Sequence, residues 1–296
     1  MDRVYEQYSI IIPVRNYNYL LKKCVLEILN FSTKIEIIIV YDEISFLNDL
    51  CIDFKEHIES QIILIKSIKK TISAKRNLGV KYSERKYVAF IDSDAFPSSD
   101  WLINANNTFR EQNEAYCVGG PNISPQDQNF INNAVGAAQK SFLVSGKWNY
   151  HKKRGVNNYV SHVPSCNLIV IKSAYLKCHG MNEKIYTGED LDFCTKINDN
   201  GKRIYFDSNV IVFHYDRGFT NYFLQKIFRG SGVAEVNLNF FEKIYLLVPL
   251  FFFIFNIMGL VSLTFKISVI LSYSYLVIIS IYSIISFFET LRYSVF

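Results

Sequence analysis

Short apolar runs alternate with segments of helical spacing over the first 240 residues of the chain. The apolar runs are brief and rich in β-branched residues, which is typical of strands buried on both faces of a sheet. We expect strands at residues 9–14, 35–40, 62–65 and 87–91, and helices at residues 20–29 and 72–82. Repeated strand–helix units of this kind predict an α/β fold, with a mostly parallel sheet flanked by helices.

The pattern changes near residue 242, where charged residues almost disappear. Residues 244–265 carry no charge, residues 267–288 carry none either, and Lys266 alone separates the two runs. As a helix, each run would reach about 33 Å at 1.5 Å per residue, enough to cross a bilayer core of roughly 30 Å. We therefore expect a domain at residues 1–240 and a membrane anchor of two transmembrane helices at residues 241–296.

One residue is too short a connection for two antiparallel helices, so the turn must take residues from both runs, around residues 264–268. A single span followed by an interfacial segment is the alternative. Lys226, Arg229 and Lys243 precede the first run and Arg292 follows the second. Because basic residues favour the cytoplasmic side of a membrane, these positions favour a hairpin with both ends in the cytoplasm.

Composition narrows the classes of protein that fit. Of 296 residues, 50% are hydrophobic and only 20% are charged, which excludes an intrinsically disordered chain. The net charge of +5 is too small to indicate a nucleic-acid partner. The six cysteines form no Cys-x-x-Cys pair, which excludes zinc-ribbon and thioredoxin-like sites. No apolar stretch near the start suits a signal peptide, so we expect reduced thiols and a cytoplasmic catalytic part.

Two carboxylates one residue apart follow the expected strand at residues 87–91. Asp92 and Asp94, with Ser93 between them, would point into one site, where they could hold a divalent ion and through it a diphosphate. An ordinary turn or helix cap is the alternative, because Asp and Ser are common loop residues. The buried strand before them and the basic segment from Lys75 to Asn77 favour the metal site.

Four stretches occur in the order typical of one enzyme family: SIIIPVRN, IEIIIVYDEIS, AKRNLG leading to FIDSDAFP, and YTGEDLDFC. With them, the chain resembles a family 2 glycosyltransferase of the GT-A fold over roughly residues 8–230. The resemblance implies a GT-A-like, Rossmann-like fold and an inverting transfer of sugar from a nucleotide-diphosphate donor. The C-terminal apolar runs lie outside it.

The resemblance also implies where the donor binds. The family's donor-binding positions correspond here to Pro13, Arg15, Asp42, Lys75, Arg76, Asn77, Asp92 and Ser93. Asp42 would contact the base or the ribose, and either Lys75 or Arg76 would neutralise the diphosphate, with Asn77 close by. The family's second strand commonly ends Val-Asp-Asp-Gly-Ser, whereas this one ends Val-Tyr-Asp-Glu-Ile-Ser at residues 40–45, which leaves the choice among UDP, GDP and dTDP open.

The metal and the catalytic base follow from the same resemblance. Asp92 would face the ribose and the metal, and Asp94 would bind Mg²⁺ or Mn²⁺ directly. His214 would complete the metal site, or it would simply close a strand and bond to the backbone. Asp190 would act as general base with Glu189 in support. Acidic residues also favour a helix N-terminus, here expected to begin at residue 187, and both roles can hold together.

The expected function is that of a membrane-anchored, metal-dependent inverting glycosyltransferase on the cytoplasmic face of the membrane. It would move a sugar from a nucleotide-diphosphate donor to a hydroxyl of a lipid-linked or cell-surface glycan. A soluble acceptor is an alternative, and so is a catalytically inactive nucleotide-binding membrane protein that acts in glycan assembly. The presence of Asp92, Asp94 and Asp190 argues against the inactive protein, and two spans without internal charge disfavour a transporter.

Overall fold

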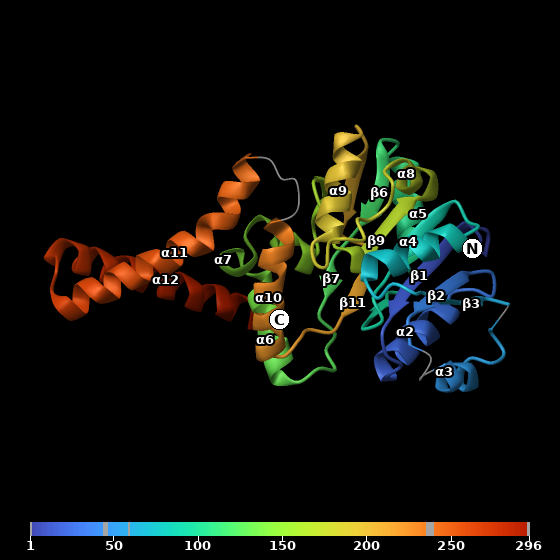
Figure 1. The fold of residues 1–296 in the computed structure, drawn as a ribbon, viewed down its shortest axis with the longest axis horizontal. Coiled ribbons are helices and arrows are strands. Elements are labelled where there is room, and N and C mark those ends of the chain that lie inside the picture. The colour runs from blue at the N-terminus through green and yellow to red at the C-terminus, as the bar shows by residue number, and fades with distance from the viewer. Residues whose placement is uncertain (1, 44–46, 59, 235–239, 295–296) are drawn as a thin grey trace.

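The chain folds into a layered α/β part from which a pair of long helices extends (Figure 1). The computed structural model describes residues 2–43, 47–58, 60–234 and 240–294. A large central sheet carries helices on its faces, and two apolar helices at the C-terminal end are candidate membrane anchors. The predicted fold class is therefore confirmed.

The main sheet has eight strands, in the order β3-β2-β1-β4-β9-β6-β10-β8. β1, β2, β3 and β4 pair in parallel, as do β6 and β10, while β8 and β9 run against their neighbours. The strands are β1 Tyr8–Val14, β2 Glu36–Tyr41, β3 Ile62–Lys66, β4 Tyr87–Phe90, β6 Ala115–Gly119, β8 Asn157–Val160, β9 Leu168–Ile171 and β10 Arg203–Asp207.

Helices pack on both faces of this sheet because successive strand residues point to opposite sides. Ile10 and Ile12 of β1 join one buried cluster with α2 and α5, and Ile11 joins the other with α4, α8 and α9. The helices of this part are α1 Asp2–Tyr5, α2 Tyr19–Leu29, α3 Leu47–Asp53, α4 Ile72–Tyr82, α5 Trp101–Glu111, α8 Lys172–Lys177 and α9 Glu189–Asp199. Asn18 and Thr71 cap the first turns of α2 and α4, which fixes where these helices begin.

A second, small sheet lies at the end of the large one. Its order is β5-β11-β7, formed by Ala95–Pro97, Val212–His214 and Asn122–Ile123. β11 pairs antiparallel with β5 and parallel with β7, so it joins the segment after β4 to the segment after β6. The short 3₁₀ helix η2, Ser165–Asn167, leads into β9 beside them.

Between the α/β part and the long helices lies a helical region with less regular structure. It comprises α6 Phe130–Lys140, α7 Phe142–Ser145, the 3₁₀ helix η1 Gly146–Lys152 and α10 Phe219–Ala234. α10 packs against α6, and the last long helix packs against α6 as well. This region therefore joins the α/β part to the C-terminal helices.

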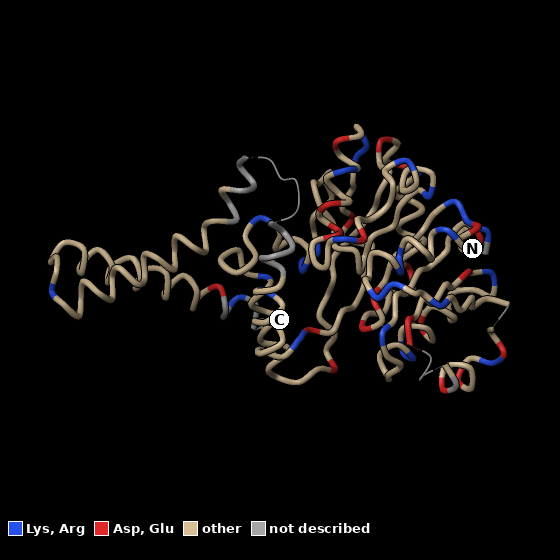
Figure 2. The backbone as a smooth tube through the Cα atoms, viewed as in Figure 1, with Lys and Arg blue, Asp and Glu red and all other residues tan. Residues whose placement is uncertain are grey.

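The C-terminal helices α11, Phe240–Phe265, and α12, Val269–Ser294, form an antiparallel hairpin (Figure 1). Leu247–Phe265 and Val269–Glu289 are long and apolar enough to cross a membrane, with mean hydropathy of 2.1 and 2.0. Charged residues are sparse along the hairpin and frequent on the α/β part (Figure 2). The turn falls at residues 266–268, within the expected region, and the second run forms the helix Val269–Ser294.

Close packing holds the hairpin together. A Cβ atom at Gly259 would lie 2.2 Å from the ring of Tyr275, so only glycine allows the helices to cross this closely. Near the turn, the Ser262 hydroxyl donates to the Ser268 carbonyl at 3.0 Å. Lys266 has a φ of 48°, which is the left-handed conformation that reverses the chain.

Candidate active site

The predicted donor residues gather where the parallel strands end. Arg15 follows β1, Asp42 follows β2, and Asp92 follows β4 after one residue. β1 lies between β2 and β4 in the sheet, so these three residues leave neighbouring strands at the same edge. In open α/β sheets this edge is where ligands bind.

The Asp92-Ser93-Asp94 segment forms a tight turn between β4 and β5. The backbone N–H of Ala95 donates to the Asp92 carbonyl at 3.1 Å, which closes the turn around Ser93. Both carboxylates are partly exposed, with 30% of the Asp92 side chain and 36% of the Asp94 side chain accessible. The segment thus forms a turn, which was the alternative to a metal site. Both carboxylates nevertheless lie at the end of β4 and are accessible.

β-pairing brings His214 to this turn. In the small sheet His214 lies opposite Ala95, so its imidazole falls beside the preceding aspartate. Nε2 of His214 lies 3.4 Å from Oδ1 of Asp94, and Nδ1 lies 2.9 Å from the Tyr215 carbonyl oxygen. The contact with the backbone, which was one of the two expectations for this histidine, fixes the ring and turns its other nitrogen toward the acids. Its role as a metal ligand stays a prediction.

Ligand atoms of Asp92, His214 and Cys166 lie within 4.8 Å of one another. The carboxylates of Asp92 and Asp94 and the imidazole of His214 are ligand types that suit Mn²⁺ or Mg²⁺. Burial and the nearby carboxylate of Asp92 raise the pKa of the Cys166 thiol, so the sulfur stays protonated and is a poor ligand. Sequence reasoning did not select Cys166, because a lone cysteine 74 positions from Asp92 gives no signal until η2 is placed beside β4.

Arg76 links the two acidic groups. Its guanidinium donates from one NH₂ group to Asp92 Oδ1 at 2.7 Å and from the other to Glu189 Oε1 at 2.8 Å. The side chain is only 1% exposed, and among the described residues its Nε has no hydrogen-bond partner. Burial lowers the pKa of Arg76, but the two carboxylates outweigh it and raise the pKa overall, which keeps the group charged.

The predicted catalytic pair lies in the first turn of α9. Gly188 precedes the helix with a φ of 89°, a left-handed conformation that glycine adopts without strain, and the helix begins two residues later than expected, at Glu189. Burial and the adjacent Asp190 raise the pKa of Glu189. Asp190 is buried, and its carboxylate accepts from the backbone N–H groups of Leu191 at 2.9 Å and Ser165 at 3.4 Å.

His162 was not expected at the site, yet it lies against the proposed base. Its Nε2 is 3.7 Å from Asp190 Oδ2, and the side chain is buried. Among the described residues neither ring nitrogen has a hydrogen-bond partner. The ring packs near Trp148 and edge-on to His151, which come from η1. Only tertiary packing reveals this histidine, because it lies in an irregular segment with no motif.

Lys75 faces away from the acids that Arg76 contacts. Its ammonium is fully buried, lies 2.8 Å from Asp42 Oδ1 and donates to the Val14 carbonyl at 2.6 Å. This buried ion pair ties the end of β1 to the end of β2. Of the two cations expected to neutralise a diphosphate, Lys75 is therefore held by Asp42, and Arg76 is the one beside Asp92.

Asn77 is occupied in a different direction. Its amide nitrogen donates to the Met181 carbonyl at 2.8 Å and to Glu183 at 3.0 Å. Its oxygen accepts from the Tyr175 hydroxyl at 2.6 Å and from the Met181 N–H at 3.0 Å. Asn77 thus holds the loop between α8 and α9, and it does not join Arg76 at the acids.

The remaining predicted residues lie at the first two strand ends. Pro13 is half-buried near the end of β1, where it lies past the last residue that pairs with β4, and Arg15 is exposed. Glu43 is exposed beside Asp42, and the two positions that follow, Ile44 and Ser45, lie outside the described residues.

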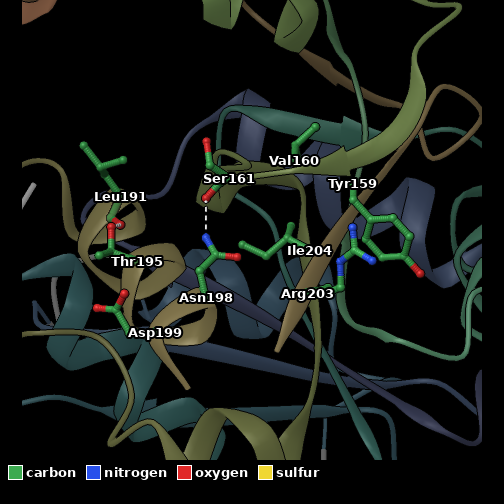
Figure 3. Close-up of a pocket in the computed structure, with 9 residues that line it drawn as sticks. All are labelled: Tyr159, Val160, Ser161, Leu191, Thr195, Asn198, Asp199, Arg203 and Ile204. Carbon is green, nitrogen blue, oxygen red and sulfur yellow. Dashed lines mark hydrogen bonds between the residues drawn. The ribbon is translucent and has the colours of Figure 1, made fainter. Parts of the chain in front are cut away.

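A cavity of about 400 Å³ lies elsewhere, between α9, β8 and β10 (Figure 3). Asn198 donates to the Ser161 carbonyl across it at 2.9 Å. Its lining residues are Tyr159, Val160, Ser161, Leu191, Thr195, Asn198, Asp199, Arg203 and Ile204. They include none of the predicted site residues, so this cavity is separate from the acids at the strand ends.

Comparison with known proteins identifies related chains. Residues 9–178 match the model of glycosyl transferase family 2. The pre-mycofactocin glycosyltransferase of Mycobacterium tuberculosis is 26% identical over 167 residues, which cover 55% of this chain and 34% of that protein. The minor teichoic acid biosynthesis protein GgaB of Bacillus subtilis is 29% identical over 119 residues, 38% of this chain and 13% of that protein. The chain thus matches about a third or less of the length of these relatives.

Solved structures share the fold. The mannosyltransferase PcManGT from Pyrobaculum calidifontis, solved with GDP-Man and Mn²⁺, superposes with a TM-score of 0.59 at 15% identity. The match covers 77% of this chain and 62% of that one. At this identity the likeness establishes the architecture of the α/β part alone.

Proposed function

Since the chain belongs to glycosyl transferase family 2 and is a glycosyltransferase, we propose that it inverts the anomeric carbon of a nucleotide-diphosphate sugar as it transfers the sugar to a glycan hydroxyl. The observation that supports this most directly is the bridge formed by Arg76, which holds Asp92 on one side and Glu189 on the other. The acids that we propose for the donor side and the acceptor side thus contact the same guanidinium.

The donor side would be formed by the ends of β1, β2 and β4. Asp42 would contact the base or ribose while Lys75 holds its carboxylate in place. Asp92, Asp94 and His214 would hold Mg²⁺ or Mn²⁺, which when bound supplies positive charge to the departing diphosphate. Arg76 acts as a positioning residue in this proposal, because its buried guanidinium orients Asp92 and Glu189.

Asp190 would be the general base. The carboxylate takes the proton of the acceptor hydroxyl, the new oxygen–carbon bond forms on the face opposite the leaving group, and the bond to the diphosphate breaks with its electron pair. The two backbone N–H groups that donate to Asp190 fix its direction. Glu189 would support it by holding Arg76.

The acceptor is proposed to be a lipid-linked or cell-surface glycan at the cytoplasmic face of the membrane. The hairpin at residues 241–296 would anchor the catalytic part, residues 1–240, close to a lipid-borne acceptor and raise its effective concentration. One relative, GgaB, is named for teichoic acid biosynthesis, which is consistent with a surface polymer. The basic residues near the hairpin ends favour this orientation.

The test is hydrolysis or transfer with a panel of UDP-, GDP- and dTDP-sugars, using the full chain in neutral detergent with and without Mn²⁺. We expect activity with one nucleotide class, lost in Asp94→Ala and Asp190→Asn. Asp199→Asn, an exposed acid at the other end of α9, is the matched control and should keep wild-type activity. Equal activity in all four proteins would refute the proposed site, and donor binding without turnover in the wild type would indicate an inactive protein.

A further inference from the structure

A cavity of about 470 Å³ beside the last long helix is lined almost entirely by cations. Its lining residues are Ile123, Lys140, Lys152, Lys153, Arg154 and Arg292, which we call the basic pocket. They come from β7, the end of α6, η1 with the loop after it, and the end of α12. Five positive side chains converging from three of these segments form a site suited to a multiply charged anion.

The pocket is held in shape by buried polar contacts. Lys152 Nζ lies 2.7 Å from Asp216 Oδ1, and the other oxygen of Asp216 accepts from Gln128 at 2.8 Å. Asp216 is only 1% exposed, so Lys152 is fixed at the pocket wall by a buried partner. On the other side, the Ser141 hydroxyl donates to Glu289, which brings the end of α12 to the end of α6.

Elements that adjoin α6 and η1 expose apolar side chains. Arg292 lies three residues after the end of the apolar segment Val269–Glu289 of α12. α7 exposes Phe142 and its neighbours, and α10, which packs on α6, exposes Phe219, Phe223 and Ile227 at a spacing of four residues along one face. A helix with such a face lies at the boundary between headgroups and acyl chains, and cations at the end of a spanning helix lie at the level of lipid phosphates.

The pocket also adjoins the proposed reaction centre. Ile123 pairs with Phe213 in the small sheet, directly before His214. Lys152 binds Asp216, which lies two residues after His214 in the sequence. The pocket thus adjoins the proposed metal site through β7 and η1. The predicted donor residues lie elsewhere, at the ends of β1 and β2.

We propose that the basic pocket binds the phosphate group of a membrane lipid that carries the acceptor. The acceptor role rests on the proposed function, whereas phosphate binding does not. A phosphate fits the charge of the pocket, and the exposed apolar side chains of α7, α10 and α12 would accommodate the chains of a lipid. The same pocket chemistry would also accept inorganic phosphate or a nucleoside diphosphate, so the test separates these sources.

The test uses the full chain in neutral detergent, titrated with dioctanoyl phosphatidic acid and followed by tryptophan fluorescence. Of the two tryptophans, Trp101 is fully buried and Trp148 lies in η1 next to the pocket, so Trp148 reports binding. The variant Lys140→Gln/Lys153→Gln/Arg154→Gln removes three charges and leaves Lys152 with Asp216. We expect about a hundredfold weaker binding, since each cation near a lipid phosphate contributes roughly fivefold.

The matched control, Lys55→Gln/Lys81→Gln/Lys177→Gln, removes three exposed charges on α3, α4 and α8 or beside them, away from the hairpin (Figure 1). It should bind as the wild type does. Asp94→Asn should still bind the lipid while losing transfer, which separates this proposal from the proposed function. Binding that is equal in the pocket variant and the control overturns the proposal. So does displacement of the lipid by UDP or by inorganic phosphate at similar concentration, since either would identify a soluble ligand.

Discussion

His214 Nε2 lies 3.4 Å from Asp94 Oδ1 although the two residues belong to distant parts of the sequence. The register of β11 on β5 produces this contact by placing His214 opposite Ala95. The small sheet is therefore the element that builds the proposed metal site, and β4 supplies the acids to it.

Asp94→Asn should lower metal-dependent transfer by about a thousandfold, because a metal contributes several kcal/mol of charge stabilisation in such reactions. His214→Ala should lower it less and should raise the Mn²⁺ concentration needed for half-maximal rate. Titration of the initial rate with Mn²⁺ measures both effects. His57→Ala, remote from the site, serves as control. An Asp94→Asn enzyme with unchanged Mn²⁺ dependence would remove this residue from the metal site.

His162→Ala should reduce kcat by about tenfold and leave the donor KM unchanged, because a neighbour that orients a catalytic group typically contributes 10–100-fold. The reason is its contact with Asp190, at 3.7 Å. The readout is the pH dependence of kcat, whose acidic limb should move when the imidazole is removed. His162→Gln retains a polar side chain and should recover part of the rate. A donor KM that rises with unchanged kcat would instead place His162 in donor binding.

Lys75→Met should destabilise the fold by about 3–5 kcal/mol, the usual cost of leaving a buried charge without its partner. The buried partner is Asp42, and the double variant Lys75→Met/Asp42→Asn should recover much of that stability. Urea unfolding in detergent measures the difference. If Lys75→Met kept full stability and only lost donor affinity, Lys75 would belong to the diphosphate site after all.

Asp216 should make stability depend on pH at the acidic end. Burial raises its pKa, but the Lys152 ammonium and the hydrogen bonds of Ser124 and Gln128 outweigh burial and lower the pKa below its ordinary value of 3.8. Since the folded state holds the proton less tightly, the contribution of Asp216 is present above that value and is lost as pH falls through the lowered pKa.

Asp216→Asn should therefore reduce the free energy of unfolding by about 2 kcal/mol near neutral pH, the scale of a charged hydrogen bond. The difference from the wild type should shrink as pH falls below 3.8 toward the lowered pKa of the folded state, because the unfolded chain takes up the proton first and the native carboxylate only later. Thermal unfolding at several pH values measures it. A difference that stays constant across this range would mean that the charge of Asp216 does not contribute.

The strands of the first half were predictable to within about a residue at each end. β1 and β2 are runs of isoleucine and valine bounded by polar residues, and burial on both faces of a parallel sheet requires that composition. Asp42 and Asp92 each come just after the C-terminal end of a parallel strand, so the sequence predicts that both lie at the same edge of the sheet. The apolar runs at the end of the chain predicted the hairpin for a similar reason, because their length and lack of charge leave few alternatives.

The grouping of Lys75, Arg76 and Asn77 was the weakest inference. Consecutive helical residues diverge by about 100°, so a helix at residues 72–82 cannot point all three at one ligand. Each side chain follows its own direction, to Asp42, to Asp92 and Glu189, and to the loop before α9. The helix predicted at residues 72–82 was therefore enough to show that the three side chains diverge.

Other site residues were beyond sequence reasoning because only long-range packing defines them. Cys166 reaches Asp92 because β9 runs against β4, and His162 reaches Asp190 because the segment before η2 crosses the start of α9. Neither belongs to a spaced motif. The basic pocket depends likewise on Arg292 returning to α6 from the far end of the hairpin.

The contact between the end of α12 and α6 would restrict how the α/β part is oriented relative to the membrane. A protein tied to a membrane by one helix and a slack linker can swivel and reach sugars at many heights. Here the chain leaves the α/β part through α11 and returns through α12, where Glu289 accepts a hydrogen bond from Ser141. The hairpin is therefore attached to the rest of the protein at both of its ends. If the hairpin spans a bilayer, attachment at both ends would hold the acids at a fixed distance from the membrane surface. The end of a glycan that has grown beyond this distance would no longer reach them.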